Sequence, residues 1–318
     1  MVLSFFRVPE DTVLHKDDPE KQYSEKVRIE TNTHLGQLKL FCNELGFLLN
    51  YVCDENMATH RKIFLYIGAG PGEHVVILAK MFPTIIWHLF DNRFTDKLRT
   101  MKNVQIFERY FTDDDVALYR DLSMKPETDV YLVSDIRNMS YASGAWTVEE
   151  ELKVVEDMSL QASWVKAIKP RFSMLKFRLP FYEEAVVKHY GGEYVNYLDG
   201  IIYKQPWARN KSTETRLVVD GSNIRDRQYS FRKYESQMFY HNVVTRNTTF
   251  LFPLSKELNR VKVSRNLTLD NHYDSAYTIS LLYNYFKRSS GDLLDTTMAS
   301  RIIKILSIVS MGVHSDYF

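Results

Sequence analysis

The feature that most constrains the fold is a glycine-rich turn between an apolar strand and a helix. The segment reads Phe-Leu-Tyr-Ile-Gly-Ala-Gly-Pro-Gly over residues 64–72. Glycine is needed where the backbone turns sharply and approaches a ligand closely, and the free N–H groups of the following helix then face that ligand. The next apolar strand ends at Asp91, roughly 20 residues further on, where a carboxylate can accept from a ribose hydroxyl. The pattern indicates an adenosine-type cofactor, and leaves open a dinucleotide, S-adenosylmethionine or a tight turn beside a solvated Asp91.

Strands and helices alternate along most of the chain, which indicates a mostly parallel sheet with helices on both faces, an α/β fold of the Rossmann-like kind. A capping box at Thr147 and Glu150 opens one helix, which stops at Pro170. We expect a single domain over residues 1–318, with an N-terminal arm over 1–30 and C-terminal helices within 265–318. The expected strands are 63–67, 85–90, 104–107, 130–133, 172–177 and 215–219. The expected helices are 36–52, 74–82, 147–168, 271–286 and 293–309.

Bulk composition describes an ordinary globular protein. The chain has 318 residues, is 45% hydrophobic and carries a net charge of +1, so it has no global charge signature of a nucleic-acid binder. Its two cysteines, Cys42 and Cys53, fall in an apolar stretch and are expected as buried free thiols. We expect neither a signal peptide nor a membrane-spanning segment, and therefore a cytoplasmic protein. No metal site is predicted.

Four charged residues stand out: Lys39, Asp135, Lys176 and Glu214. Asp135 follows an apolar strand, at the sheet edge where ligands bind in open α/β folds. Lys176 lies within the apolar strand Met-Leu-Lys-Phe, where a lysine is costly unless it is paired or functional. Each residue alone is explained by an ion pair at the edge of the core, and the four share one pocket only if the sheet is wound as expected.

Several segments in order resemble the poxvirus family of cap-specific nucleoside 2′-O-methyltransferases, whose members are also the small subunit of the viral poly(A) polymerase. The resemblance covers roughly residues 20–245 and implies the class I S-adenosylmethionine-dependent methyltransferase fold. The matching segments are Gly36-Gln-Leu-Lys39-Leu, Tyr66-Ile-Gly-Ala-Gly-Pro-Gly72, Ser134-Asp135-Ile-Arg137, Leu175-Lys176-Phe-Arg178, Glu214-Thr-Arg216-Leu, Tyr234-Glu235 and Met238-Phe-Tyr.

The resemblance implies methyl transfer from S-adenosylmethionine to the ribose 2′-hydroxyl of the first transcribed nucleotide. It makes Lys39, Asp135, Lys176 and Glu214 the catalytic set, with Lys176 positioning and deprotonating the hydroxyl, a role typically worth about 10²–10⁴-fold in rate. The acids then orient the lysines rather than activate them. The implied cofactor residues are Gln37, Tyr66, Gly68, Gly72, Asp91, Arg93, Phe111 and Asp135.

For 7-methylguanosine-capped mRNA, the resemblance implies a base stacked between two aromatic rings, with acids accepting from its edge. Methylation makes the base cationic, which strengthens stacking on electron-rich rings. The chain departs from the family at Lys211, where the family has an aromatic residue. The implied cap and RNA residues are Tyr23, Arg178, Phe181, Glu183, Ser212, Thr213, Arg216 and Glu235.

Three alternatives remain at this point. The chain could be only a processivity partner of a poly(A) polymerase catalytic subunit, an NAD-linked oxidoreductase, or a 2′-O-methyltransferase of uncapped RNA. The oxidoreductase would leave Lys39, Lys176 and Glu214 without a task. Residues 204–233 hold eight Lys or Arg against three acids, which predicts either a groove that follows an RNA backbone or a solvated basic face.

Overall fold

A seven-stranded sheet organises the computed structural model, which describes residues 12–24, 35–53, 60–137, 147–182, 184–252, 254–258, 261–264, 267–290 and 296–311. Four neighbouring pairs in the sheet are parallel, and the strands at one edge, β8 and β7, are antiparallel additions. The sheet order is β3 (Val104–Glu108), β2 (Ile86–Asp91), β1 (Arg61–Ile67), β4 (Thr128–Ser134), β5 (Phe172–Phe177), β8 (Thr215–Asp220) and β7 (Ile201–Tyr203).

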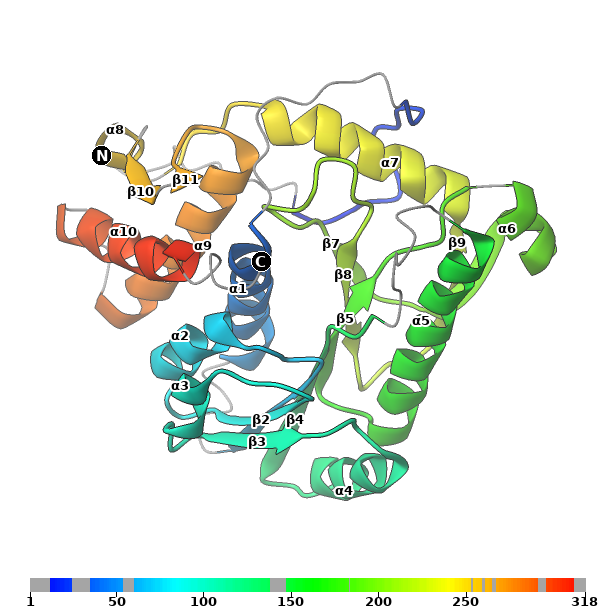
Figure 1. The fold of residues 1–318 in the computed structure, drawn as a ribbon, viewed down its shortest axis with the longest axis horizontal. Coiled ribbons are helices and arrows are strands. Elements are labelled where there is room, and N and C mark those ends of the chain that lie inside the picture. Colours follow the sequence, from blue (N-terminus) through cyan, green and yellow to red (C-terminus); the bar gives the residue numbers. More distant parts are fainter. Residues whose placement is uncertain are drawn as a thin grey trace.

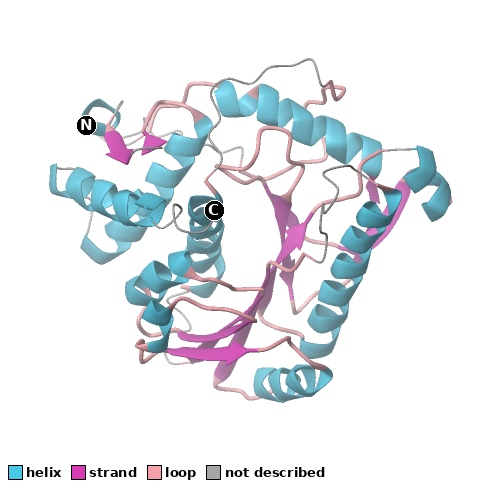
Figure 2. Ribbon diagram, viewed as in Figure 1, coloured by secondary structure: helices cyan, strands magenta, loops and turns pink. Residues whose placement is uncertain are grey.

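Helices cover both faces of this sheet (Figures 1 and 2). One face is packed against α1 (Gly36–Phe47), its π-helical extension η1 (Leu48–Val52), α2 (Glu73–Met81), α9 (Tyr273–Ser290) and α10 (Thr296–Met311). The other face is packed against α4 (Asp113–Ser123), α5 (Val148–Ile168) and the start of α7 (Phe231–Val243). The predicted Rossmann-like α/β fold is confirmed.

The smaller elements lie around this framework. Two further sheets have two antiparallel strands each. The helical elements are α3 (Asp96–Arg99), α6 (Glu184–Tyr190), η3 (Thr245–Asn247) and α8 (Ser255–Leu258). The strand pairs are β6 (Tyr194–Leu198) with β9 (Asp226–Ser230), and β10 (Lys262–Ser264) with β11 (Leu267–Thr268).

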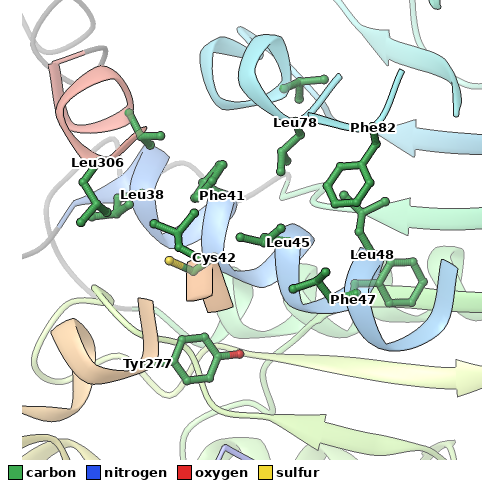
Figure 3. Close-up of a cluster of buried hydrophobic side chains, with 14 of the residues drawn as sticks. Leu38, Phe41, Cys42, Leu45, Phe47, Leu48, Leu78, Phe82, Tyr277 and Leu306 are labelled. Atoms are coloured by element: carbon green, nitrogen blue, oxygen red, sulfur yellow. The ribbon is translucent and has the colours of Figure 1, made fainter. Parts of the chain in front are cut away.

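Side-chain alternation in β1 divides the core into two layers. Phe64 and Tyr66 point into the cluster that contains α1 and α9, whereas Leu65 and Ile67 point into the cluster that contains α5. Every one of these side chains is almost wholly buried. Figure 3 shows the first layer, where Phe41 and Leu45 of α1 lie among side chains from α2, α9 and α10. Burial on both faces is what parallel strands with continuous apolar sequence require.

The N-terminal segment over residues 12–24, here called the strap, lies beside α7 and β7 (Figure 1). Val13 bridges Tyr203 at the outer edge of β7, and the Leu14 N–H donates to the Ile202 carbonyl oxygen at 2.7 Å. The strap therefore covers a sheet edge whose polar backbone groups would otherwise stay unpaired. The described part of the predicted arm thus takes an extended course against the domain.

The elements predicted from sequence all occur with small shifts at their ends, but several others were missed. The helix α4 is the clearest miss, because Thr112 and Asp115 form a reciprocal capping box that marks its start. The edge strand β7 is only three residues long, too short for an alternation pattern to detect. At α5 the Thr147 side chain accepts from the Glu150 N–H at 3.2 Å, as predicted.

We expect Leu45→Ala to lower the free energy of unfolding by about 2–5 kcal/mol, because the wholly buried leucine leaves a cavity between α1 and its neighbours. Leu118→Ala on α4 is the matched control; its side chain is 52% exposed, so its effect should stay within about 0.5 kcal/mol. Urea denaturation of both variants measures the difference. Equal losses would contradict the assignment of Leu45 to the core.

Candidate active site

The register of the parallel strands brings distant residues to one edge of the sheet. Ile67 pairs with Phe90 of β2 and with Ser134 of β4, and Ser134 pairs with Leu175 of β5. These four residues form a row across the sheet near the carboxyl ends of the strands. The residues that directly follow the row are Gly68, Asp91, Asp135 and Lys176. Four of the predicted site positions therefore share one edge because of strand pairing alone.

Glu214 and Lys39 reach the same edge from outside the parallel strands. Glu214 directly precedes β8, whose Arg216 pairs with Lys176 in the antiparallel ladder. Lys39 lies in the first turn of α1, which packs over the sheet. The fold thus brings together the four residues that the sequence singled out, and it adds Arg216 to them.

Five charged side chains make contact at this point. The Nζ of Lys176 lies 3.2 Å from Asp135 Oδ1 and 3.5 Å from Glu214 Oε2. The Nζ of Lys39 lies 2.7 Å from Glu214 Oε1. The Nη2 of Arg216 lies 2.8 Å from Asp135 Oδ1 and 3.7 Å from Glu214 Oε1. The four predicted side chains keep 12–15% of their surface exposed, whereas Arg216 keeps 3%. The cluster therefore opens to solvent on one side and rests on Arg216 at its base.

Three cations face two carboxylates in this cluster, and the pKa directions follow from that excess. Burial alone would raise the pKa of Asp135, but Arg216 and Lys176 hold it below its usual value. Burial would also raise the pKa of Glu214. The charges of Lys176, Lys39 and Arg216 outweigh this effect, so the pKa of Glu214 lies well below its usual value. The pKa of Lys39 is lowered, first by burial and then by its cationic neighbours, against the pull of Glu214. Both acids are therefore ionised at neutral pH, and Lys39 loses its proton more readily than a lysine in water.

Neutral side chains fix the orientation of this cluster. The Gln205 amide donates to the Glu214 carbonyl oxygen at 2.7 Å and lies 3.3 Å from Glu214 Oε1. Asn43, one turn after Lys39 on α1, donates to Gln205 Oε1 at 2.6 Å. Gln161 of α5 donates to the carbonyl oxygen of Lys176 at 3.1 Å. Both faces of the sheet thus contribute hydrogen bonds that hold the charged groups in place.

The glycine-rich turn lies beside the charge cluster, with Gly68 against the backbone of Asp135. Gly68 and Gly72 adopt φ values of +80° and +78°, which favour glycine. Gly70 has another requirement, because an added Cβ would lie 2.5 Å from the Arg93 carbonyl oxygen and 2.6 Å from Asp91 Cγ. The Gly70 N–H donates to Asp91 Oδ2 at 3.0 Å, which orients that carboxylate at the end of β2. The turn and Asp91 therefore form one compact unit.

The other predicted cofactor residues surround this turn at different depths. Tyr66 is buried beneath it, and its hydroxyl donates to Glu44 Oε1 at 2.6 Å. The Gln37 side-chain oxygen accepts from the His74 N–H at 3.3 Å, which ties α1 to the start of α2. Arg93 is exposed and Phe111 half-buried, with its ring 5.3 Å from that of Trp164. Tyr66 thus supports the site from below, and the others line its rim.

Phe181, one of the two rings predicted for the cap, lies just beyond β5. The Arg178 guanidinium carbon lies 4.7 Å from the centre of this ring, and the Phe181 N–H donates to Glu151 Oε2 at 3.1 Å. Arg178 itself pairs with the buried Glu151 at 2.9 Å. Arg178 therefore supports Phe181 from inside, and its near-complete burial does not fit the predicted direct contact with RNA. Glu183 lies outside the described residues.

The second predicted ring, Tyr23, lies against α7. Its ring centre is 5.2 Å from that of Phe239, and the Lys211 ammonium lies 5.7 Å from it. Glu235 precedes Phe239 by one helical turn, so the two share a face of α7. Tyr23 and Lys211 are therefore in contact, and Glu235 lies one helical turn before the phenylalanine on which Tyr23 packs, with Tyr23 39% exposed. Lys211 stands where the family pattern has an aromatic residue, and it makes a cation–π contact with Tyr23.

The predicted RNA contacts near Glu214 occupy structural positions. The Asn242 side chain donates to the Ser212 carbonyl oxygen at 2.8 Å, and the Tyr234 hydroxyl donates to the Thr213 carbonyl oxygen. Thr213 and Arg216 are almost wholly buried. Arg216 therefore belongs to the charge cluster and is not exposed for the predicted RNA contact, because its position on β8 buries it at the base of the cluster.

The basic stretch over 204–233 is not uniformly exposed. Lys204 is buried and pairs with Asp18 at 2.9 Å, while Arg225 and Arg227 both pair with Asp199. The charges that appear together in sequence are separated by β8 and β9. Lys204 and Arg216 therefore contribute no exposed charge to a groove, and an RNA-binding role for the other basic residues of the stretch stays a prediction.

Within the part of the chain that the structure describes, no cluster of three or more His, Cys, Asp or Glu side chains could hold a metal ion. None of the helices in that part of the chain has the length and apolar character needed to cross a membrane.

The residues that sequence reasoning missed are Arg216 as a member of the charge cluster, Asn43 and Gln205. Their only sequence signal is polarity inside apolar segments, which is the signal that identified Lys176.

Comparisons with known proteins agree on one family. A family model described as "Poly A polymerase regulatory subunit" matches residues 11–303. A fowlpox virus protein named cap-specific mRNA (nucleoside-2′-O-)-methyltransferase is 30% identical over 243 residues, 71% of this chain and 73% of that protein. A myxoma virus protein of the same name is 30% identical over 247 residues, 72% of this chain and 68% of that protein. A solved antibiotic-related methyltransferase superposes with a TM-score of only 0.23 at 10% identity, over 67% of this chain and 100% of that one.

We expect Gly70→Ala to lower the free energy of unfolding by about 1–3 kcal/mol, because its Cβ can be accommodated only if the turn or the Asp91 segment shifts. Gly192→Ala is the matched control, since an added Cβ there meets nothing within 4 Å. Denaturant unfolding of both proteins measures the contrast. If Gly70→Ala were as stable as Gly192→Ala, the turn would have space for a Cβ at this position, contrary to the structure.

Proposed function

Because this chain belongs to the poly(A) polymerase regulatory subunit family, we propose that it is the methyltransferase named in its curated relatives, specific for the ribose 2′-oxygen of capped mRNA. The observation that carries the proposal is the charge cluster of Lys39, Asp135, Lys176 and Glu214 beside the glycine-rich turn. An oxidoreductase would need the turn but not the two lysines and Glu214. We place the activity in a single domain formed by residues 1–318, working in the cytoplasm.

The site fits S-adenosylmethionine. Gly70 leaves no room for a Cβ between the turn and the Asp91–Arg93 segment, so the turn and the Asp91 carboxylate are held together beside the charge cluster. Asp91 would hold the ribose hydroxyls, Gly68 and Gly72 the amino-acid portion, and the backbone near Phe111 the adenine. When bound, S-adenosylmethionine supplies an electrophilic methyl group on a sulfonium centre.

The charge cluster then prepares the nucleophile. Lys176 projects from the last parallel strand, and its Nζ is held by Asp135 and Glu214 at 3.2 and 3.5 Å. We assign it to orient the ribose 2′-hydroxyl and to accept its proton, so that the oxygen can attack the methyl carbon in line. Lys39, whose pKa is lowered chiefly by burial, adds positive charge to the cluster, which favours a deprotonated hydroxyl oxygen beside it. Asp135 and Glu214 keep their charges and orient the lysines.

Phe181, Tyr23 and Glu235 are our candidates for cap recognition. One face of Phe181 is taken by Arg178 and one contact of Tyr23 by Lys211, so a methylated guanine would use the remaining faces. Because that base is positively charged, it stacks on electron-rich rings more strongly than the base of an unmethylated cap does. Glu235 would accept from the N–H groups of the base edge. The first transcribed nucleotide would then lie toward Lys176.

The family description favours a second role, as a partner of a poly(A) polymerase catalytic subunit. Methyl transfer depends on the open charge cluster, whereas binding of a polymerase subunit would use an outer surface. The two roles are therefore compatible in one chain. Co-purification with such a catalytic subunit, by wild type and by a methylation-dead variant alike, tests the partner role separately.

The activity is tested by transfer of a tritiated methyl group from S-adenosylmethionine to four short RNAs. These carry a 7-methylguanosine cap, an unmethylated cap, no cap, or a cap followed by a 2′-O-methylated first nucleotide. We expect incorporation into the first RNA only. Equal incorporation into uncapped RNA would remove the cap from the proposal, and incorporation into the 2′-O-methylated RNA would move the target to another position.

With the 7-methylguanosine-capped RNA, Lys176→Ala should reduce turnover by at least about 10²-fold, the usual scale of general-base assistance, and leave S-adenosylmethionine affinity within about twofold. Lys166→Ala is the control, since it removes a lysine that is half exposed on α5 and pairs with Asp226 at 2.9 Å. Normal turnover by the Lys176 variant would exclude this residue from the chemistry.

A further inference from the structure

The strap is tied to the domain by buried polar side chains. The Gln237 amide of α7 donates to three strap carbonyl oxygens, those of His15, Lys16 and Asp18, at 3.0, 3.2 and 3.1 Å. Only 5% of Gln237 is exposed. A buried amide that hydrogen-bonds three successive parts of one loop fixes the course of that loop, because each carbonyl left unpaired would be costly.

Asp18 is the second anchor. Its Oδ2 accepts from the His15 N–H at 3.1 Å and from the Lys204 ammonium at 2.9 Å. Lys204 is 2% exposed and its own N–H donates to the Thr12 carbonyl oxygen at 2.8 Å. One carboxylate therefore closes the turn of the strap and pairs with a buried cation at the edge strand β7. We call Asp18, Lys204 and Gln237 the strap lock.

The strap lock lies directly upstream of Tyr23. After Asp18 the strap continues along α7, where the Lys21 N–H donates to the Ser236 carbonyl oxygen at 3.0 Å. Tyr23 then packs edge-on against Phe239, two helical positions beyond Gln237. The contacts from Gln237 to Phe239 thus run along one helix and set where the exposed Tyr23 ring lies.

We propose that Asp18, Lys204 and Gln237 are positioning residues for the capped end of the RNA, acting through Tyr23. This proposal rests on the proposed function, in which Tyr23 stacks on the cap. A free N-terminal segment would lose backbone entropy each time its ring closed on the base. Because the strap lock orders the segment beforehand, that loss does not weaken cap binding. The lock determines affinity for the cap and leaves the chemical step unchanged.

The adjacent residue, Gln205, provides an internal contrast. Lys204 holds the strap, whereas Gln205 hydrogen-bonds Glu214 of the charge cluster. A change confined to the strap lock should raise KM for capped RNA. A change that spreads through residue 205 to the charge cluster would instead lower kcat. The division between KM and kcat therefore separates positioning of the cap from general damage to the site.

The test is a double-mutant cycle on the full chain, with Tyr23→Ala, Gln237→Leu and the combined variant, assayed with 7-methylguanosine-capped RNA. Loss of the ring should raise KM by about 5- to 150-fold, which corresponds to base–aromatic stacking of about 1–3 kcal/mol. Gln237→Leu should raise KM by about 3- to 30-fold with kcat within twofold. The combined variant should match Tyr23→Ala alone, because residues that act through one another do not have additive effects. Gln228→Leu, at an exposed site on β9, is the matched control and should change nothing.

Asp18→Asn is the second strap-lock variant, since it keeps the size of the side chain and removes the charge that pairs with Lys204. It should reproduce the Gln237→Leu pattern, with a cooperative thermal transition above the assay temperature and normal S-adenosylmethionine binding showing that both proteins are folded. Additive effects of Tyr23→Ala and Gln237→Leu, a fall in kcat, or unchanged KM in both strap-lock variants would each overturn the proposal. An unchanged KM for Tyr23→Ala would overturn it as well, whereas wild-type protein that methylates no capped RNA would refute the proposed function itself.

Discussion

In the charge cluster, which is largely buried and open to solvent on one side, three cations share two carboxylates. Desolvated charges are tolerated only when paired with good geometry, and removal of one partner usually costs far more than the pair contributes. Here Asp135 and Glu214 each contact two or more cations, and Arg216 closes the base of the cluster. The parallel strands provide the positions, because their register delivers Asp135 and Lys176 to neighbouring places on one edge. Lys39 and Glu214 are then added from α1 and from the loop before β8.

The same excess of positive charge connects stability to chemistry. It lowers the pKa values of both acids, and it adds to burial in lowering the pKa of Lys39. Positive charge at this edge also favours a deprotonated hydroxyl oxygen, which the proposed methyl transfer requires. The glycine-rich turn follows β1, which pairs with β4, so the proposed site of the methyl donor and the proposed proton acceptor are held by one sheet. The strap and α7 add the surface on which the far end of the substrate would rest.

Sequence alone predicted the parts of this account that rest on local pattern. Apolar strands, the glycine-rich turn and Asp91 have recognisable spacing, and Lys176 was conspicuous because a lysine in an apolar strand requires an explanation. Arg216 shows where such reasoning ends, since its sequence environment is equally compatible with RNA contact and with burial. Only the antiparallel pairing of β8 with β5 decides between them. The basic stretch divides for a related reason, because Lys204 and Arg216 are buried in ion pairs whereas Arg225 and Arg227 pair with Asp199.

The unfolding free energies of Glu214→Gln, Lys39→Met and the double variant show whether the five charges act as one coupled unit. Glu214→Gln leaves three cations around Asp135 and should cost about 3–5 kcal/mol, the scale for breaking a buried pair. Adding Lys39→Met removes the unpaired cation, so the double variant should be more stable than Glu214→Gln alone. If the two costs simply add, the cluster is a set of independent pairs and the account is wrong.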